Sequence, residues 1–413
     1  MDALVNSQDR SLRDRAKLVV PGGMWGHMNA TALPEGYPQF FARGAGSRLW
    51  DVDGNEYVDF MCSWGPIILG HHHPEVDEAA HRQLALGDCL NGPGEAMVQL
   101  AELIVDLVPH ASWVQFQKNG TDATTTAATI ARAGTGHRKI LVARGAYHGA
   151  VPWCSPSLVG VTAEDRAHII QYEYNDIESL HQACEQARGD LAAIIVSGFQ
   201  HDYGFDQALP TQAFGQAARA AADAGEAALI VDDVRAGFRL NLGGSWENIG
   251  VRPDLSAWSK SIANGFALAA VTGNDRFREA TSSIFTTGSF WCSAVSMAAG
   301  FATLTALRRD DGVGHMTRMG QLLRDGLADL SRTYQLPIRQ SGPVQMPTVL
   351  FDDDADRRKG FAFCSAAVRH GVYFHPLHNM FLSAAHSPKD IERALDAAES
   401  GFRAARAASP AHD

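Results

Sequence analysis

Between residues 96 and 231, short apolar runs alternate with longer segments whose apolar residues recur at helical spacing. The short runs predict buried strands, and the longer segments predict helices. In chain order these are 96–108 (helix), 113–117 (strand), 120–133 (helix), 140–143 (strand), 192–196 (strand), 211–224 (helix) and 228–231 (strand). This alternation is typical of a parallel sheet covered by helices on both faces. The sequence therefore predicts an α/β fold, in which ligands bind at the carboxyl ends of the strands.

The two ends of the chain have different patterns. Residues 1–20 predict an amphipathic helix that ends at Pro21-Gly22-Gly23, and residues 47–60 predict a hairpin around an Asp53-Gly54 turn. After about residue 310 come amphipathic helices and scattered strands. These strands lie at 348–351 and 371–374, and a last helix begins at Pro388. We expect a large domain at 61–310 and a small domain formed by 1–60 and 311–413.

Composition argues against several classes of partner. The chain has 413 residues and a net charge of −11, so no basic stripe is available for nucleic acid. No apolar run is long enough to span a bilayer, and the polar, acidic N-terminus is unlike a signal peptide. The six cysteines are scattered without a Cys-x-x-Cys pair, which indicates reduced thiols. These features predict a cytoplasmic protein without a nucleic-acid or membrane partner.

Two clusters of candidate metal ligands have simpler explanations. Asp51, Asp53 and Asn55 have a spacing close to that of a calcium loop, but the glycine falls in the wrong place and the predicted turn accounts for them. The three histidines at 71–73 are adjacent, and neighbours in sequence seldom converge on one ion. A loop that enters a helix at 75–86 explains them better. We therefore predict no metal site.

Residues 118–122, Lys-Asn-Gly-Thr-Asp, follow a predicted strand and open a predicted helix. Gly120 would let the backbone approach a ligand closely, and Thr121 offers a hydroxyl group. The first amides of the helix are free and carry positive partial charge, which suits a phosphate group. Because many helices begin in this way without a ligand, an ordinary helix start remains open.

Two further residues follow predicted strands at the same edge of the sheet. Asp232 directly follows the 228–231 strand, where an ionised carboxylate could keep the nitrogen of a pyridine ring protonated. An N-cap for the next segment is the alternative. Tyr147 follows the 140–143 strand and could stack on a planar ligand or pack in the core.

Lys260 has the most distinctive surroundings among the six lysines of the chain. An apolar run at 255–258 precedes it, and Asn264-Gly265 follow it closely. Apolar surroundings lower the pKa of a lysine, so that its neutral amine can form a Schiff base. A lysine on a surface loop is the alternative. Together with a phosphate site, an aromatic ring and an aspartate, Lys260 completes the groups that a pyridoxal phosphate enzyme needs.

From about Pro21 to the final helix, the sequence resembles the class III aminotransferases of the fold-type I pyridoxal phosphate superfamily, in the branch that holds glutamate-1-semialdehyde aminomutase. The resemblance is carried by Trp50-Asp-Val-Asp-Gly54, Ser63-Trp-Gly-Pro66, Leu69-Gly-His71, Asn119-Gly-Thr-Asp-Ala123, Tyr147-His-Gly149, Asp232-Asp-Val-Arg-Ala-Gly-Phe-Arg239, Pro253-Asp-Leu255 with Lys260, and Phe381-Leu-Ser-Ala-Ala-His386. It implies a large domain with a mostly parallel sheet and a smaller α+β domain built from the two termini. It also implies a homodimer with active sites at the subunit interface.

The resemblance assigns the cofactor, pyridoxal 5'-phosphate, to five residues. Lys260 would hold it through a Schiff base and later move a proton, Asp232 would pair with its pyridine nitrogen, and Tyr147 would stack on its ring. Gly120 and Thr121 would bind its phosphate from the same subunit.

Four more residues are implied at the phosphate and the substrate pocket. Ser289, where the family usually has threonine, would reach the phosphate across the dimer interface. Trp64 would line the substrate pocket. Arg235 or Arg239 could bind an acceptor carboxylate, and either could instead form a structural ion pair.

Several positions depart from the family pattern. Asp233 replaces the usual glutamate, Ser197-Gly198 replaces a Glu-Pro pair, and Arg235 stands where many relatives have glutamine or methionine. His375-Pro-Leu-His-Asn379 replaces the aminomutase pattern near the C-terminal pocket. These departures count against the aminomutase and leave the substrate open.

We therefore predict a transaminase that moves an amino group from a primary amine, of a long-chain or aminopolyol type among others, to a keto acid such as pyruvate by a ping-pong mechanism. A mutase, racemase or decarboxylase that uses the same cofactor is the alternative, because a fold does not determine a reaction. A binding or regulatory protein is disfavoured by the presence of Lys260 and Asp232.

Overall fold

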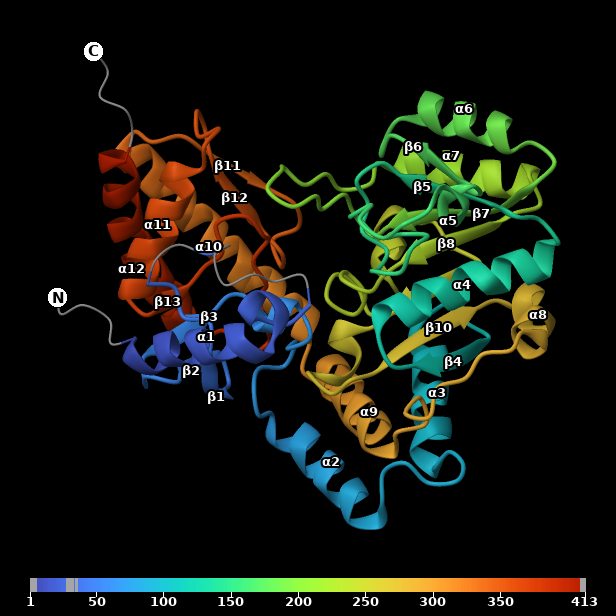
Figure 1. Cartoon of the computed structure of the whole chain (residues 1–413), viewed down its shortest axis with the longest axis horizontal. Helices are drawn as coiled ribbons and strands as arrows, with labels where there is room; N and C mark the ends of the chain where they lie inside the picture. The colour runs from blue at the N-terminus through green and yellow to red at the C-terminus, as the bar shows by residue number, and fades with distance from the viewer. Residues whose placement is uncertain (1–5, 27–32, 34–35, 409–413) are drawn as a thin grey trace.

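The computed structural model describes residues 6–26, 33 and 36–408, and its largest element is a seven-stranded sheet (Figure 1). The strand order is β4-β10-β9-β8-β7-β5-β6. Only β10 is antiparallel to its neighbours, so the other six strands run in one direction. The bounds are β4 Trp113–Gln117, β5 Lys139–Ala143, β6 Ile169–Tyr172, β7 Leu191–Ser197, β8 Ala228–Asp232, β9 Leu255–Trp258 and β10 Ala269–Gly273.

Helices cover both faces of this sheet. Successive side chains of a strand point to opposite faces, and β7 is buried along its whole length. Ile195 packs in the apolar cluster that contains α4, whereas Ile194 packs in the cluster that contains α6 and α7. These helices are α4 Gly120–Thr135, α6 Ile177–Ala187 and α7 Gln212–Ala224, and the short helices nearby are α5 Ala163–Arg166 and α8 Arg278–Ser283. The predicted α/β class of the large sheet is therefore confirmed.

A second lobe is built from both ends of the chain. Strand β13 pairs in parallel with β3, with Val372 opposite Val58, in a four-stranded sheet of order β1-β2-β3-β13. Helices α10, α11 and α12 pack together beside this sheet. The bounds are α1 Ser7–Val19, β1 Phe41–Ala45, β2 Arg48–Asp51, β3 Glu56–Asp59, α10 Gly312–Tyr334, β11 Ile338–Ser341, β12 Thr348–Phe351, α11 Arg358–Arg369, β13 Val372–Tyr373 and α12 Pro388–Ala407. The boundaries 1–60, 61–310 and 311–413 stay predictions.

Three helices lie below the large sheet in the view of Figure 1. They are α2 Pro74–Leu86, α3 Glu95–Leu107 and α9 Ala294–Arg309, and α9 packs against both of the others. Short 3₁₀ helices occur at η1 Pro21–Gly23, η2 Cys62–Trp64, η3 Ser245–Ile249, η4 Lys260–Ala263 and η5 Asp275–Phe277. No helix within the described residues is long and apolar enough to cross a membrane.

The predicted elements agree with these bounds to within a few residues. Helix α1 covers the described part of the predicted 1–20 helix, and residues 1–5 lie outside the described residues. Two strands next to the site, β9 and β10, were not predicted. Strand β10 has the sequence Ala-Ala-Val-Thr-Gly, and alanine and glycine are depleted in strands, so local preference gives no strand signal there.

The two clusters of candidate metal ligands take up ordinary structural roles. Asp51 accepts hydrogen bonds from the amides of Asp53 and Asn55 and from the hydroxyl of Tyr57, which completes the predicted turn. His71 contacts Asp59 at 2.8 Å. Within the described residues, no group of three or more His, Cys, Asp or Glu could hold a metal ion.

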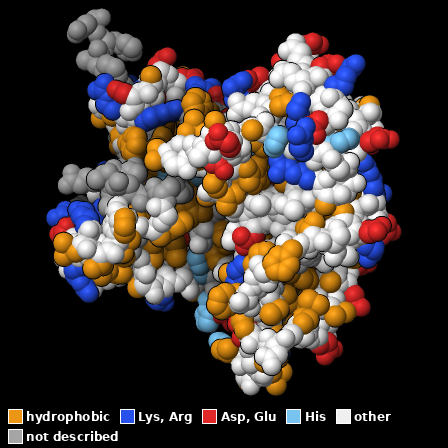
Figure 2. Space-filling view, turned by 45° about the vertical axis from the view of Figure 1, so that its right-hand side comes forward, with side chains coloured by type: hydrophobic (Ala, Val, Ile, Leu, Met, Phe, Trp, Pro, Cys, Tyr) orange, Lys and Arg blue, Asp and Glu red, His pale blue; other side chains and the backbone are white. Residues whose placement is uncertain are grey.

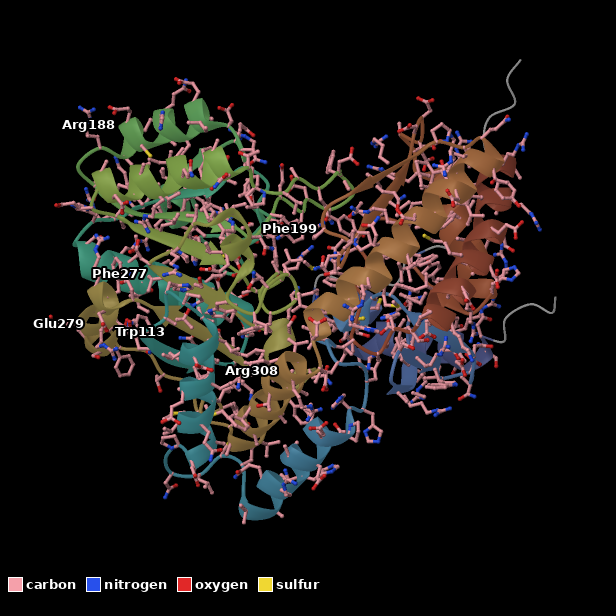
Figure 3. The ribbon with its side chains drawn as sticks, turned by 180° about the vertical axis from the view of Figure 1, so that it is seen from behind. Trp113, Arg188, Phe199, Phe277, Glu279 and Arg308 are labelled. Carbon is pink, nitrogen blue, oxygen red and sulfur yellow. The ribbon has the colours of Figure 1, made fainter. Side chains whose placement is uncertain are left out.

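A buried apolar cluster and a surface segment join the two lobes. Phe199 lies where the lobes meet (Figure 3) and packs in a cluster with Ile67, Met346 and Phe381. The segment 200–208 then reaches from the large sheet to β11 and β12 (Figure 1), and the amide of Gly204 within it donates to the carbonyl of Leu377 at 2.8 Å. Figure 2 shows hydrophobic side chains along the hollow between the lobes.

Asn264 connects the loop after β9 to the segment at 68–70. Its side-chain oxygen accepts from the amides of Ile68 and Leu69 at 2.9 and 2.8 Å, and its side-chain nitrogen donates to the carbonyl of Gly70 at 2.9 Å. Asn264 itself is buried and has a left-handed φ of 45°. Asparagine tolerates this conformation better than most residues.

We predict that Asn264→Ala destabilises the protein by at least about 2 kcal/mol, because two buried amides lose their acceptor and alanine disfavours a left-handed φ. Thermal unfolding monitored by circular dichroism should show a Tm several degrees lower. Asn248→Ala is the matched control, since Asn248 is exposed and its side chain accepts a hydrogen bond from the side chain of Asn241. Equal Tm values for the two variants would contradict a structural role for Asn264.

Candidate active site

Three strands of the large sheet bring the site residues to one edge. Strand register places Asp232 beside Ser197 of β7 and beside Ala257 of β9. Lys260 follows the end of β9, and Tyr147 lies in the loop after β5. Because these strands are parallel, their carboxyl ends meet at the same edge, as the sequence predicted.

Lys260 is held in a strained and apolar position. Its φ is 47°, in the left-handed region that non-glycine residues seldom adopt. Burial lowers the pKa of Lys260 to about 7, and the nearby guanidinium groups of Arg235 and Arg239 lower it too, against the opposing effect of Asp232. Among the described residues, the Lys260 amine has no hydrogen bond or ion pair. A large fraction of the amine is thus neutral at physiological pH.

His148 orients Asp232. This histidine lies in the Tyr147-His-Gly149 motif, but the sequence alone did not indicate a role for it. The carboxylate is 8% exposed, and one oxygen lies 2.7 Å from Nδ1 of His148. The other oxygen accepts from the amide of Val234 at 3.1 Å. His148 is held in turn, because its carbonyl accepts from the hydroxyl of Thr124 at 2.6 Å. His148 is therefore a positioning residue for Asp232.

The start of α4 has free donors and close backbone approaches. Asn119 caps the helix in a capping box with Asp122, and the amides of Gly120 and Thr121 come too early in the helix for an intrahelical acceptor. A Cβ at Gly120 would come within 2.6 Å of Val234, and one at Gly149 within 2.8 Å of the Thr121 hydroxyl. Both glycines therefore keep the backbone close around this helix end.

Tyr147 and Arg235 lie close to Asp232. Tyr147 is 42% exposed, and its pKa is raised mainly by burial, with Arg235 and Asp232 both near enough to contribute. Burial lowers the pKa of Arg235 to about 10, while Asp232 and Tyr147 oppose that change. The Arg235 guanidinium donates to the side-chain oxygen of Asn379 at 2.7 Å. Arg235 thus belongs to the site.

Arg239 has different surroundings. It is fully buried, and its guanidinium donates to the backbone carbonyls of Leu382, Gly65 and Ile67. With its donors directed at these carbonyls, Arg239 ties the segment at 65–67 to the C-terminal lobe. Arg239 therefore has structural contacts, but within the described residues they are with backbone carbonyls and not the ion pair that the sequence left open.

Trp64 lies on an unusual stretch of backbone. Cys62, Ser63 and Trp64 all have positive φ values, between 47° and 66°, and Gly65 continues at 108°. A Cβ at Gly65 would come 3.3 Å from Cδ of Lys260, so this segment runs directly beside the lysine side chain. The indole ring of Trp64 contacts the rings of His375 and His378, with centroids 5.3 and 5.0 Å away.

Ser289 is the one predicted site residue that this chain does not bring to the others. It is exposed in the segment between α8 and α9. No hydrogen bond within the described residues joins it to Lys260, Gly120 or Thr121. Its predicted role requires a second subunit and stays a prediction.

The residues at this edge fit pyridoxal phosphate. The unpaired amine of Lys260 could hold the aldehyde carbon, and the carboxylate of Asp232 could face a pyridine nitrogen. The free amides at the start of α4 suit a phosphate group. With the parallel sheet, this set of groups defines a fold-type I transferase that depends on pyridoxal phosphate.

Comparisons with known proteins identify the family. A family model for aminotransferase class-III matches residues 32–388. An aminopentol aminotransferase of Sphingopyxis macrogoltabida is 47% identical over 398 residues, which are 96% of this chain and 94% of the relative. A glutamate-1-semialdehyde 2,1-aminomutase of Acetivibrio thermocellus is 33% identical and covers 94% of this chain and 96% of the relative. The chain belongs to the class III aminotransferases.

A solved structure agrees with this assignment. The PLP internal aldimine form of the FumI protein of Sphingopyxis sp. MTA144 superimposes with a TM-score of 0.95, at 47% identity, over 96% of both chains. The protein is thus a PLP-dependent aminotransferase, which moves an amino group from a donor to a carbonyl acceptor. The resemblance stated from the sequence motifs is confirmed.

We predict that the protein freed of cofactor captures added pyridoxal phosphate with a pH midpoint near 7, because the neutral form of Lys260 predominates above its lowered pKa. Stopped-flow absorbance at pH 5.5 to 9 measures the rate. Arg235→Gln should move the midpoint to higher pH, because a cation that disfavours the charged amine is removed.

Arg188→Gln is the matched control, since Arg188 is exposed at the outer end of α6 (Figure 3). It should leave the midpoint unchanged. A midpoint above pH 9 in the unaltered protein would contradict the proposed effect of burial on Lys260.

Proposed function

We propose that the protein transfers the amino group of a primary amine, including long-chain and aminopolyol-type amines, to a keto acid, with pyruvate as the expected acceptor. The donor leaves as a carbonyl compound before the acceptor enters, so that the reaction is ping-pong. The observation that carries this proposal is the position of the Lys260 amine beside Asp232 and Arg235, without a hydrogen bond among the described residues and with its pKa lowered by burial to about 7. The name of the 47% identical relative, an aminopentol aminotransferase, supports the donor class.

The bound cofactor supplies an aldehyde for condensation with the amine and a ring that withdraws electrons from the α-carbon. Lys260, once released, would take the proton from that carbon in its neutral form and deliver it to the carbon of the cofactor, and the second half-reaction would reverse this transfer. The pKa of Lys260, about 7, suits both the uptake and the release of this proton, because either protonation state of the amine is accessible at physiological pH. Asp232, held by His148, would pair with the ring nitrogen.

Arg235 is the residue that we propose for the acceptor carboxylate. Its guanidinium lies near both Lys260 and Asp232, and Asn379 occupies only one of its nitrogens. A planar guanidinium can bind a carboxylate through two parallel hydrogen bonds. Arg239 is not given this role in the proposal, because both terminal nitrogens of its guanidinium already donate to backbone carbonyls.

A homodimer completes the proposed site. Ser289 would then reach the phosphate group of the partner subunit. Large hydrophobic side chains around this segment support the proposal, since Phe285 is 93% and Phe290 is 65% exposed in the single chain. Exposed apolar groups of this size commonly mark an interaction site.

Lys260→Ala tests the proposed chemistry. We expect turnover of amine and pyruvate to fall by at least about three orders of magnitude, because the proton carrier is lost. Alanine formed from pyruvate is the measured product, and circular dichroism checks that the fold is retained. Lys17→Ala, an exposed lysine on α1, should keep full turnover. Turnover by Lys260→Ala at the rate of the unaltered protein would refute the assignment.

Arg235→Gln tests the proposed carboxylate site. We expect KM for pyruvate to rise by about tenfold or more, which corresponds to the loss of one charge-assisted contact. Steady-state kinetics with each substrate varied in turn separate this effect from any change in KM for the amine.

Arg239→Met is the comparison, and it should lower Tm because three buried carbonyls lose their donor. A larger rise in the pyruvate KM for Arg239→Met than for Arg235→Gln would reverse the assignment of the two arginines.

A further inference from the structure

Two histidines from the segment after β13 lie beside the active site. His378 is close enough to Arg235 and Lys260 for both cations to lower its pKa, although burial is the largest cause. Burial lowers the pKa of His375 to about 4. Both imidazoles are therefore neutral at physiological pH, and each has one nitrogen that donates and one that accepts.

Backbone contacts determine which nitrogen of His375 carries the proton. Its Nδ1 accepts hydrogen bonds from the amides of Leu377 and His378, at 3.2 and 2.9 Å. The proton of the neutral ring must then lie on Nε2. This Nε2 is buried and has no hydrogen-bond partner within the part of the chain that the structure describes, and His375 is 6% exposed. Such an atom is costly to leave unpaired, so it marks a place for a ligand acceptor.

The opposite tautomer follows for His378. Its Nδ1 lies 2.7 Å from the carbonyl oxygen of Asn379. A carbonyl only accepts, so Nδ1 carries the proton and Nε2 has the free lone pair. His375 and His378 thus leave one donor and one acceptor for a ligand.

The two imidazole rings lie beside each other in an edge-to-face arrangement. Their centroids are 6.1 Å apart and their planes are inclined by 81°. Two hydrogen bonds of about 2.8 Å to one tetrahedral oxygen place their nitrogens roughly 4.6 Å apart. Trp64 contacts both rings. The ring centroid of Tyr203, from the segment 200–208, lies 6.2 Å from that of His375 and 6.3 Å from that of His378. Gly65, which follows Trp64, lies beside the side chain of Lys260, so this segment connects the histidines to the lysine.

A hydroxyl group is the ligand that this combination suits. It accepts one hydrogen bond and donates another, whereas a carboxylate has no proton to donate and an ammonium group cannot accept. We propose that His375 and His378 together bind a hydroxyl group on the tail of the amine, so that the enzyme selects amino alcohols over plain alkyl amines. This inference rests on the proposed function and adds the residues that recognise the tail of the substrate.

The selectivity of the holoenzyme tests the proposal. We would compare kcat/KM for 2-aminooctane with kcat/KM for its 3-, 4- and 5-hydroxy derivatives, with pyruvate as acceptor. The best hydroxylated amine should be preferred by about tenfold or more, which corresponds to one or two buried hydrogen bonds that the alkyl amine leaves unmade. His378→Phe keeps a ring of similar size but removes the acceptor, and it should reduce the preference to less than about threefold.

Two variants serve as comparisons. His378→Gln keeps a hydrogen-bond acceptor and should retain more of the preference than His378→Phe does. His181→Phe, on the exposed surface of α6, should keep both the activity and the preference of the unaltered enzyme. The visible band of bound cofactor and circular dichroism verify that each variant is folded and loaded.

The proposal is overturned if no hydroxylated amine is preferred, or if His378→Phe retains the preference. If none of the four amines is deaminated, the proposed function fails instead. Calorimetric titration of the loaded protein with the same amines then tests the histidines alone, because tighter binding of an amino alcohol that His378→Phe abolishes does not require turnover.

Discussion

The burial of one amine is the constraint on which the rest of the site depends. Lys260 is half-buried and lies beside two guanidinium groups, and both effects disfavour its charged form. The left-handed φ of Lys260 has a conformational cost that the surrounding structure must offset. Asn264 and Arg239 contribute to this, since each holds the backbone at 65–70 against the loop or lobe next to the lysine. Charged and polar residues around Lys260 thus determine how the reactive amine behaves.

The parallel sheet brings the remaining groups to that amine. Ser197, Asp232 and Ala257 lie side by side in adjacent strands, so the residues that follow each strand converge on one edge. The second lobe adds a wall to this edge, because the segment after β13 carries His375, His378 and Asn379. The residues that would hold the cofactor therefore come from the large sheet. The residues that we propose for substrate selection come mainly from the place where the two lobes meet.

Much of this arrangement could be predicted from the sequence, for identifiable physical reasons. Buried strands such as β7 are continuous apolar runs, and the Asp53-Gly54 turn has its own local chemistry, so both leave clear patterns. Strand β10 could not be predicted because its alanines and glycine have weak strand preference. It is a strand because it pairs with its neighbours β4 and β9. The roles of His148 and of the His375–His378 pair could not be predicted either. They depend on hydrogen bonds between residues that are far apart in the chain or on backbone geometry that spacing does not reveal. The two arginines were both candidates by sequence, and only their contacts distinguish them.

We propose that one site takes an amino group from an amine, stores it, and gives it to a keto acid. The most direct measurement is the visible absorption spectrum of the purified, cofactor-loaded protein during stepwise addition of an amine and then pyruvate. We expect the amine to bleach the band of bound cofactor without pyruvate present, and pyruvate alone then to restore it, with one alanine formed for each cofactor. A band that amine leaves unchanged, or turnover of amine that never requires a keto acid, would contradict it.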